Sequence, residues 1–540
     1  MATSSVFSST RTQVRPANTK NAAGGVAYTL GTKEALARYA VTNTFGGTFY
    51  ASAETQLSEL QDMVAQVDDE FVAALAVYSR KAAHMKDMPA FLLSALSVRS
   101  PSLLKTVFPL VADNAKMVKN FVQILRSGTA GRRSLGTAPK RLVQRWLRDR
   151  TPQQLINDSV GGNPSLVDLI KMVHPRPADL QQEALFGVML GRQVEEGALP
   201  AEWSALKAFH RGETNTPPDV SFQLLTGQPL LKAQWVEIAK KAPWQMTRIN
   251  LNTFLRHGVF DSPDMVALIA QRLSCAELIR KARVLPYQLL SAYTNVDPGM
   301  PRAIVSALHD AIEIACENVP SWPGKKVVIA VDVSASMKDP VTGKRAGATS
   351  KVRCVDVAAL MASALLRKNP DAHIVCFEGR VRTCHLEPRD TVMTNAMKMA
   401  ALAGGSTDCG AAMRQIQTAH PDADLVVFVS DNESWKQYGH RGRSARQGTD
   451  LSELWASYRR KNPTAKMVLL DVTPTMDSQN YTQDRVLNIA GFSDAVFTAL
   501  DGFLMHDARG EGYWEGVIHH AYQQALKGRE SLPSATAEDA

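Results

Sequence analysis

Lys326-Val-Val-Ile-Ala-Val-Asp-Val-Ser-Ala-Ser-Met337 is the stretch that decides the fold of this 540-residue chain. Its first half is a near-continuous apolar, largely β-branched run, as a strand buried on both faces of a parallel sheet requires. Its second half is the pattern DxSxS. Open α/β sheets bind ligands where loops leave the carboxyl ends of their strands, so this stretch also shows where to look for a site.

Strands and helices alternate in the residues that follow. The sequence predicts helices over 351–368, 408–418 and 451–461, and strands over 372–377, 425–429 and 467–472. Such alternation is typical of a doubly wound α/β domain with a parallel sheet.

Residues 55–320 instead carry a helical period. In Asp69–His84 the apolar residues fall at i, i+4, i+7 and i+11, on one helix face. Pro101, Pro139, Pro152 and Pro177 are candidate helix starts, and Gly128 and Gly191 are candidate stops. Successive short helices favour an α-solenoid of the HEAT kind, although no fixed-period repeat is present and an ordinary helical bundle stays an alternative.

Four segments result: a flexible tail over 1–25, a helical part over 26–322, the α/β domain over 323–527, and a short tail over 528–540. Residues 1–33 contain no Asp or Glu, which also fits an organelle transit peptide. Six cysteines without a CxxC pair argue against a disulfide framework and a zinc site, and make the cytoplasm the expected compartment. No apolar run is long enough to predict a membrane helix.

Alternate residues of the DxSxS loop point the same way, so Asp332, Ser334 and Ser336 can converge on one point. Carboxylate and hydroxyl oxygens suit Mg²⁺ best here, with Mn²⁺ or Ca²⁺ as alternatives. Two further loops, residues 404–408 (GGSTD) and 430–434 (SDNES), reach the same sheet edge. The plainer interpretation is a polar strand-to-helix turn with serine capping.

The order of these three loops resembles the metal-ion-dependent adhesion site (MIDAS) of von Willebrand factor A domains. That resemblance, over residues 325–505, implies direct metal ligation by Asp332, Ser334 and Ser336. It implies that Thr407 ligates directly or lies nearby, and that Asp431 ligates directly or through water. In this family the ion usually keeps one position open for an acidic group of a partner. A metal-assisted hydrolase is a remaining alternative and would need Asp408 or Glu433 as general base.

One region carries the positive charge. Residues 80–150 hold 15 Lys or Arg and three acidic residues, a local balance of +12 in a chain of net charge +9. Arg141, Arg145 and Arg148 share one face of a helix predicted over Pro139–Arg150, whereas Val143, Trp146 and Leu147 are available for packing. This pattern favours a polyanion, although a merely solvated helix face or a phospholipid surface are alternatives.

The complete set of candidate nucleic-acid contacts is Lys119, Arg126, Arg132, Arg133, Lys140, Arg141, Arg145, Arg148, Lys171, His174 and Arg176. His174 precedes a proline at a predicted helix end, where an imidazole commonly just caps carbonyls. On the residues alone, the capping role and the contact role are equally open.

Several segments of the helical part resemble the TROVE module of Ro proteins. They are Arg38–Ala51 (RYAVTNTFGGTFYA, with Phe49 where Tyr is common), Leu169–Pro177 (with Arg176 replacing Lys), Ala242-Pro-Trp244 through Asn250-Leu251, and Leu285-Pro286-Tyr287. A TROVE module followed by an A domain is the Ro architecture, and the match covers residues 30–510. It implies an α + α/β fold: a HEAT-like helical ring closed by the von Willebrand factor A domain.

The resemblance also implies a function. Ro proteins are non-enzymatic and bind small noncoding Y RNAs on a basic outer surface and single-stranded 3′ ends of misfolded RNAs in the ring hole. By this match His174 corresponds to an RNA-contacting histidine, and Lys140, Arg141 and Arg145 to the basic helix. A bacterial, monomeric ribonucleoprotein acting in RNA quality control with a 3′ exoribonuclease is expected. The alternative is a metal-dependent protein scaffold without RNA.

Overall fold

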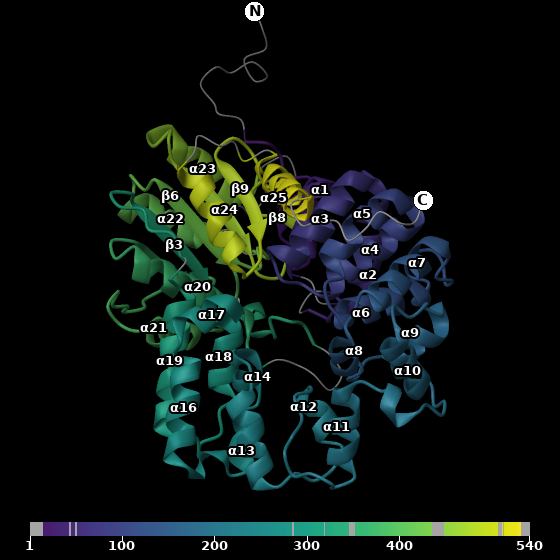
Figure 1. The fold of residues 1–540 in the computed structure, drawn as a ribbon. Helices are drawn as coiled ribbons and strands as arrows, with labels where there is room; N and C mark the ends of the chain where they lie inside the picture. Colours follow the sequence, from purple (N-terminus) through teal and green to yellow (C-terminus); the bar gives the residue numbers. More distant parts are fainter. Residues whose placement is uncertain are drawn as a thin grey trace, which may run out of the picture.

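The computed structural model describes residues 14–42, 45–48, 51–282, 284, 286–317, 319–344, 351–434, 448–505, 510 and 512–530. Phe49 and Leu285, which belong to the motifs quoted above, lie outside this set. The two predicted parts are both present: a long series of helices and an α/β domain (Figure 1).

The α/β domain is built on one six-stranded sheet of order β5-β4-β3-β6-β7-β9. The strands are β3 (Val327–Asp332), β4 (His373–Phe377), β5 (Val381–Arg382), β6 (Leu425–Ser430), β7 (Lys466–Asp471) and β9 (Val486–Ala490). All neighbours pair in parallel except the short edge strand β5, which is antiparallel to β4. The predicted strands are therefore confirmed, and β5 and β9 are additions.

Helices cover both faces of this sheet, which explains why β3 is apolar throughout. Val327, Ile329 and Val331 belong to the core shared with α20 (Cys354–Lys368), α21 (Val392–Ala400) and α24 (Asp494–Met505). Val328 and Ala330 face α22 (Cys409–Ala419) and α23 (Asp450–Lys461). With both faces buried, alternation of polar and apolar residues has no role.

The first half is helical, with no strand among its described residues from 51 to 317. Its helices are α1 (Thr32–Thr42), α2 (Ala53–Gln66), α3 (Asp69–Lys81), α4 (Asp87–Arg99), α5 (Pro101–Val111), α6 (Ala115–Ser127), α7 (Thr137–Arg148), α8 (Pro152–Asp158), α9 (Leu166–Val173), α10 (Leu180–Met189), α11 (Ala201–His210), α12 (Phe222–Leu225), α13 (Lys232–Lys241), α14 (Trp244–Ile249), α15 (Leu251–Arg256), α16 (Pro263–Leu273), α17 (Ala276–Ala282), α18 (Pro286–Thr294) and α19 (Arg302–Ala315).

The predicted helix ends are mostly confirmed. Pro101 and Pro152 are the first residues of their helices, and Pro139 lies in the first turn of α7. Gly128 caps α6 in the left-handed conformation. Pro177 does not begin a helix; α10 starts later because the Asp179 side chain caps it by accepting the Gln182 amide.

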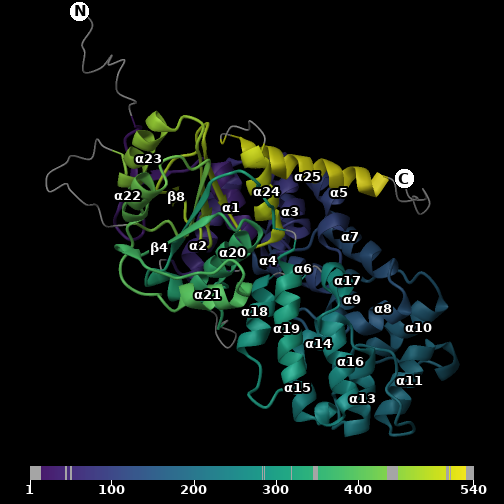
Figure 2. The same ribbon diagram turned by 90° about the vertical axis from the view of Figure 1, so that its left-hand side faces the viewer.

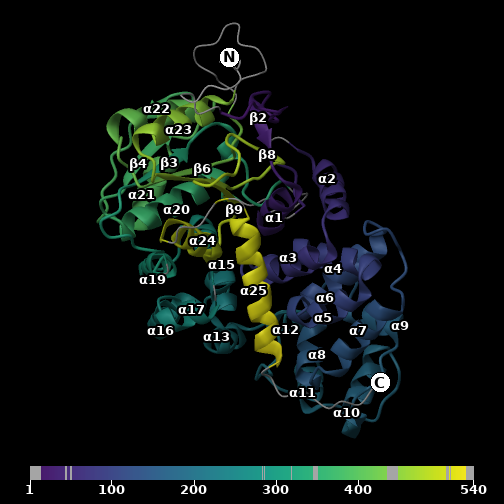
Figure 3. The same cartoon turned by 90° about the horizontal axis from the view of Figure 1, so that it is seen from above.

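The helices follow a curved path that leaves the α/β domain and returns to it (Figures 1 and 3). At one end α1 packs on β9, and at the other α18 and α19 pack on α20 and α21. The last helix, α25 (Tyr513–Glu530), runs from the α/β domain along α3 (Figure 2), where the rings of Phe71 and His519 lie 6.2 Å apart. The α/β domain thus joins the two ends of the helical path.

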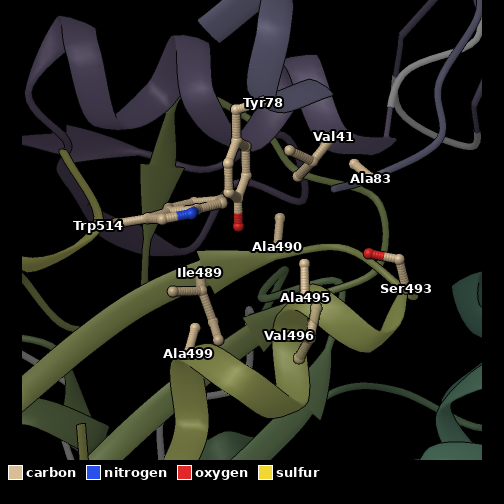
Figure 4. Close-up of a pocket in the computed structure, with 10 residues that line it drawn as sticks. All are labelled: Val41, Tyr78, Ala83, Ile489, Ala490, Ser493, Ala495, Val496, Ala499 and Trp514. Atoms are coloured by element: carbon tan, nitrogen blue, oxygen red, sulfur yellow. The ribbon is translucent and has the colours of Figure 1, made fainter. Parts of the chain in front are cut away.

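A small apolar cavity marks the place where α1, α3, β9, α24 and α25 meet (Figure 4). Tyr78 of α3 reaches down beside Trp514 of α25, with its hydroxyl directed toward β9. Burial raises the pKa of Tyr78, while a hydrogen bond from Trp514 lowers it. Both rings are almost completely buried, so this junction is a packed core and not an open pocket.

The expected flexible tail over 1–25 is wrong for residues 14–25, whereas residues 1–13 lie outside the described set. The strands β1 (Thr19–Lys20) and β2 (Val26–Thr29) form a hairpin that pairs with β8 (Asp477–Ser478) of the α/β domain. Tyr28 lies 5.0 Å from Tyr481 ring to ring and shares a 2.8 Å hydrogen bond with Ser452. These contacts hold the segment in place. At the other end α25 extends to Glu530, past the predicted boundary at 527.

Among the described helices, none combines the length and apolarity that crossing a bilayer demands.

Candidate functional site

The DxSxS residues converge at the carboxyl end of β3, as predicted. Asp332 ends this strand, and its Oδ1 accepts the Ser334 amide at 2.8 Å. The hydroxyls of Ser334 and Ser336 are 3.2 Å apart. Asp332, Ser334 and Ser336 are all buried, so these oxygens face one another inside the protein.

The two other predicted loops are tied to the first. Gly404 donates to the Val333 carbonyl at 2.7 Å, and Ala335 donates to the Gly405 carbonyl at 3.2 Å. Gly405 has a φ of +83°, a left-handed conformation that favours glycine, and a Cβ there would also displace the Glu378 carboxylate. Thr407 is buried, and its carbonyl accepts the Ser434 hydroxyl at 3.5 Å.

Asp431 follows β6 and completes the cluster of oxygens. Burial is the main cause that raises the pKa of Asp332 to about 6. Burial followed by the Asp332 charge raises the pKa of Asp431 to about 8, and a hydrogen bond with Ser336 opposes this shift. No described Lys or Arg forms an ion pair with either carboxylate. Two buried, uncompensated carboxylates beside hydroxyl oxygens fit a hard divalent cation.

Histidine and cysteine take no part in this cluster. Within the described ranges, no group of three or more His, Cys, Asp or Glu side chains could hold a metal ion. Any ion at Asp332 and Asp431 would therefore depend on serine and threonine hydroxyls for further ligands, which excludes a typical zinc site.

The two candidate general bases are engaged elsewhere. Glu433 accepts the Ala23 amide at 3.1 Å and the Thr475 hydroxyl at 3.2 Å, and burial raises its pKa to about 9. Asp408 is buried and pairs with Arg414 at 2.7 Å. Neither arrangement presents a carboxylate to a substrate, which weighs against the hydrolase alternative.

Sequence reasoning missed several residues that surround the cluster. The Ser430 hydroxyl donates to the second carboxylate oxygen of Asp332, Oδ2, at 2.6 Å. Asn432 donates to Asp471 at 3.1 Å, and Asp471 in turn pairs with the buried Arg38 of α1. Ser430 and Asn432 lie in the quoted SDNES loop and could have been suspected. Arg38 could not, because no local pattern links it to a strand more than 400 residues away.

The basic helix α7 presents its charges as predicted. Val143 and Leu147 are fully buried, and Arg141, Arg145 and Arg148 are exposed on the opposite face. Arg145 makes only a weak contact with Asp149, at 3.6 Å. The guanidiniums are therefore available to solvent or to a ligand.

Tertiary structure brings α6, α7 and α9 together. Gln144 of α7 donates to the Val173 carbonyl at 2.6 Å, and Arg126 of α6 contacts the Met172 sulfur at 3.0 Å. His174 caps α9 in the left-handed conformation, with φ +52°, and its side chain is exposed. We call the resulting set the basic surface: Arg126, Arg133, Lys140, Arg141, Arg145, Arg148, Lys171, His174 and Arg176.

Two predicted contacts do not belong to this surface. Lys119 is buried, and its ammonium donates to the carbonyls of Asp158, Val160 and Gly161 at 2.7–3.0 Å. Arg132 folds back on its own loop and donates to the carbonyls of Ser134 and Leu135. Because the Lys119 cation is buried against these oxygens, it is corrected to a structural role. Arg132 is partly exposed, and its contact with RNA stays a prediction.

Known proteins with the same architecture are similar to this chain. Residues 326–504 match the family described as the Ro60 vWA domain. The chain is 26% identical to the RNA-binding protein RO60 of Deinococcus radiodurans over 539 residues, which cover 91% of this chain and 95% of that protein. The crystal structure of the D. radiodurans RO (RSR) protein superposes with a TM-score of 0.58 at 20% identity, covering 88% of this chain and 100% of that one.

Proposed function

Because residues 326–504 are a Ro60-type von Willebrand factor A domain and the similarity to Ro proteins extends over most of the chain, we propose that this protein binds RNA without catalysis. The relative from D. radiodurans carries the name of an RNA-binding protein. The observation that carries the proposal for this chain is the basic surface, where three helices bring their cations together.

The chemistry of that surface suits a folded RNA. Guanidiniums aligned on one face of α7 can each contact a phosphate oxygen, and among the described residues the carboxylate that pairs with them is Asp149, 3.6 Å from Arg145. Double-stranded RNA is recognised mainly by its shape and backbone, which demands charge and spacing more than base-reading side chains. His174, exposed beside Lys171 and Arg176, would add a contact at the end of α9.

The finer proposal follows the Ro resemblance. The basic surface binds a small noncoding Y RNA, and single-stranded 3′ ends of misfolded RNAs enter the ring hole. The protein then acts as a cytoplasmic, monomeric ribonucleoprotein in RNA quality control and decay, beside a 3′ exoribonuclease. The curved helical path closed by the A domain supports a ring of this kind.

We further propose a divalent cation, Mg²⁺ before Mn²⁺ or Ca²⁺, held by Asp332, Ser334, Ser336, Thr407 and Asp431. When bound, the ion would supply a positive charge that offsets the two buried carboxylates, and it would attract an acidic group of a partner. The protein's own residues orient the loops and exclude bulk water from the carboxylates.

RNA binding is tested across a salt series with a structured RNA that has a single-stranded 3′ tail. The combined variant Arg141→Glu, Arg145→Glu, Arg148→Glu should bind more weakly, with a slope of log Kd against log salt flatter by about three, because three phosphate contacts are lost. The control Lys241→Glu, Arg256→Glu, Lys281→Glu makes the same change in net charge at exposed positions elsewhere. It should retain the wild-type slope.

Equal losses in both variants would mean that overall charge, and not the basic surface, attracts RNA. Undiminished binding by the first variant would exclude this face. If the wild type itself does not bind RNA, the alternative of a metal-dependent protein scaffold gains support.

A further inference from the structure

The loop that carries Asp431 is held by residues from the opposite end of the chain. Asn432, the next residue, has a left-handed φ of +58° and donates to Asp471 Oδ2 at 3.1 Å. The same Oδ2 accepts a hydrogen bond from Arg38 of α1. A guanidinium, a carboxylate and an amide thus form a buried chain that leads from the helical part to the residue beside Asp431.

All the hydrogen bonds described for the Arg38 side chain go to residues of the α/β domain. Its side chain is fully buried, and besides Asp471 it donates to the carbonyls of Thr475 at 3.3 Å and Asp477 at 3.1 Å. Burying a guanidinium is costly unless it is paired and hydrogen-bonded. Here both terminal nitrogens donate hydrogen bonds, whereas the buried Nε has no hydrogen-bond partner among the described residues. Without Arg38, the carboxylate of Asp471 would remain buried beside the Asp431 loop without its cation.

The next two residues of the same loop also bind the N-terminal segment. Glu433 accepts the Ala23 amide at 3.1 Å, and the Ser434 carbonyl accepts the Asn21 side-chain amide at 2.8 Å. Residues 432–434 are therefore all connected, directly or through Asp471, to residues 21–38.

The loop that follows the DxSxS motif is held in the same way. Gly47 and Lys344 exchange two backbone hydrogen bonds, of 3.1 and 2.6 Å. A Cβ at Gly46 would lie 2.6 Å from the Thr342 carbonyl oxygen, so the close contact between these two segments depends on glycine. Segments on both sides of α1 thus contact two of the three loops that supply the candidate metal ligands, or their continuations.

We propose that Arg38 is a positioning residue for the candidate metal site, and that cation binding and docking of residues 21–42 and 45–47 on the A domain stabilise each other. The inference rests on the cation proposed above. A coupling of this kind is reciprocal. A change that destabilises docking of the segment lowers the affinity for the cation, and cation binding stabilises the docked segment.

Mn²⁺ binding to the full-length protein, followed by electron paramagnetic resonance, tests the first half of this coupling. Arg38→Met should weaken Mn²⁺ affinity about 10- to 100-fold, the usual effect of losing a group that orients a ligand loop. Arg38→Lys keeps the positive charge but loses the several donors of the guanidinium, so its Mn²⁺ affinity should lie between those of the wild type and Arg38→Met. The matched control is Arg99→Met: Arg99 bonds the carbonyls of Val64 and Val67 and pairs with Asp69, entirely within the helical part. It should change the affinity less than twofold.

Hydrogen–deuterium exchange of the wild type tests the second half and needs no variant. Addition of Mn²⁺ should slow exchange in residues 32–42, and exchange in α11 and α13 should not change. Unaltered exchange in α1, an Arg38→Met affinity within twofold of wild type, or equal losses in both methionine variants would each overturn the coupling. Absence of any Mn²⁺ binding by the wild type would overturn the cation site itself, and the coupling with it.

Discussion

At the scale of single residues, burial determines what each charged group does. Asp332 and Asp431 are ordinary aspartates in the sequence, but burial places their pKa values at about 6 and about 8. Lys119 looks like its exposed neighbours in a basic region, yet its ammonium lies against three carbonyls. The same residue types therefore become candidate ligands, structural contacts or a surface charge, depending on the solvent around them.

Asp332 and Asp431 should make the stability of the folded protein depend on pH. Because their pKa values are raised in the folded protein, it keeps protons that the unfolded chain has lost between about pH 4 and pH 8. Without a cation, stability should fall as pH rises through this window. Mg²⁺ replaces the lost protons, so the rise in Tm that it causes should be larger at pH 8 than at pH 5, measured against EDTA.

Asp431→Asn is the control for that experiment, since it removes one of the two charges and should abolish the effect of Mg²⁺ on Tm. A Tm rise that is identical at the two pH values would show that Mg²⁺ binds somewhere other than this carboxylate pair.

At the scale of elements, cations and amides of one helix repeatedly cap the carboxyl end of another. Lys119 does so just beyond α8, Gln182 for α7, Arg99 for α2 and Arg272 for α13. The last carbonyls of a helix have no partner within it, so these side chains satisfy them and fix the contact between neighbours. Part of the positive charge in the helical region therefore serves packing.

Lys119→Met should consequently lower stability without weakening RNA binding. The loss of hydrogen bonds from a charged, buried donor to partly buried carbonyls costs about 2 kcal/mol. Thermal or urea unfolding should show the destabilisation, while the salt dependence of RNA affinity should stay at its wild-type slope. A flatter slope in this variant would instead return Lys119 to the RNA-binding residues.

At the scale of the whole molecule, the α/β domain closes the helical path. Its sheet receives α1 on β9, and α25 crosses from it to α3 (Figures 2 and 3). Tyr78 and Trp514 fill the junction that these elements share (Figure 4). The two parts therefore depend on each other for the burial of their facing surfaces.

Trp514→Ala should loosen this junction selectively. Removing a buried indole costs about 3–5 kcal/mol where the surroundings cannot collapse. Hydrogen–deuterium exchange should rise in α1, α3 and α25, and it should stay slow in the central strands β3 and β6, whose neighbours are unchanged. Uniformly faster exchange would mean that the chain unfolds as one unit.

The sequence by itself determined the two-part fold, the strands β3, β4, β6 and β7, the helices α20, α22 and α23, and the convergence of Asp332, Ser334 and Ser336, because these features follow from local periodicity and from the rule that parallel strands end at one edge. It also determined the face of α7 that carries Arg141, Arg145 and Arg148, since helical spacing is local.

Only the tertiary structure decided that β1 pairs with β2 and β2 with β8, that the Lys119 cation is buried against main-chain carbonyls, and that Arg38 reaches Asp471. These outcomes depend on which groups are buried together, and contacts between residues hundreds of positions apart leave no periodic signal in a single sequence.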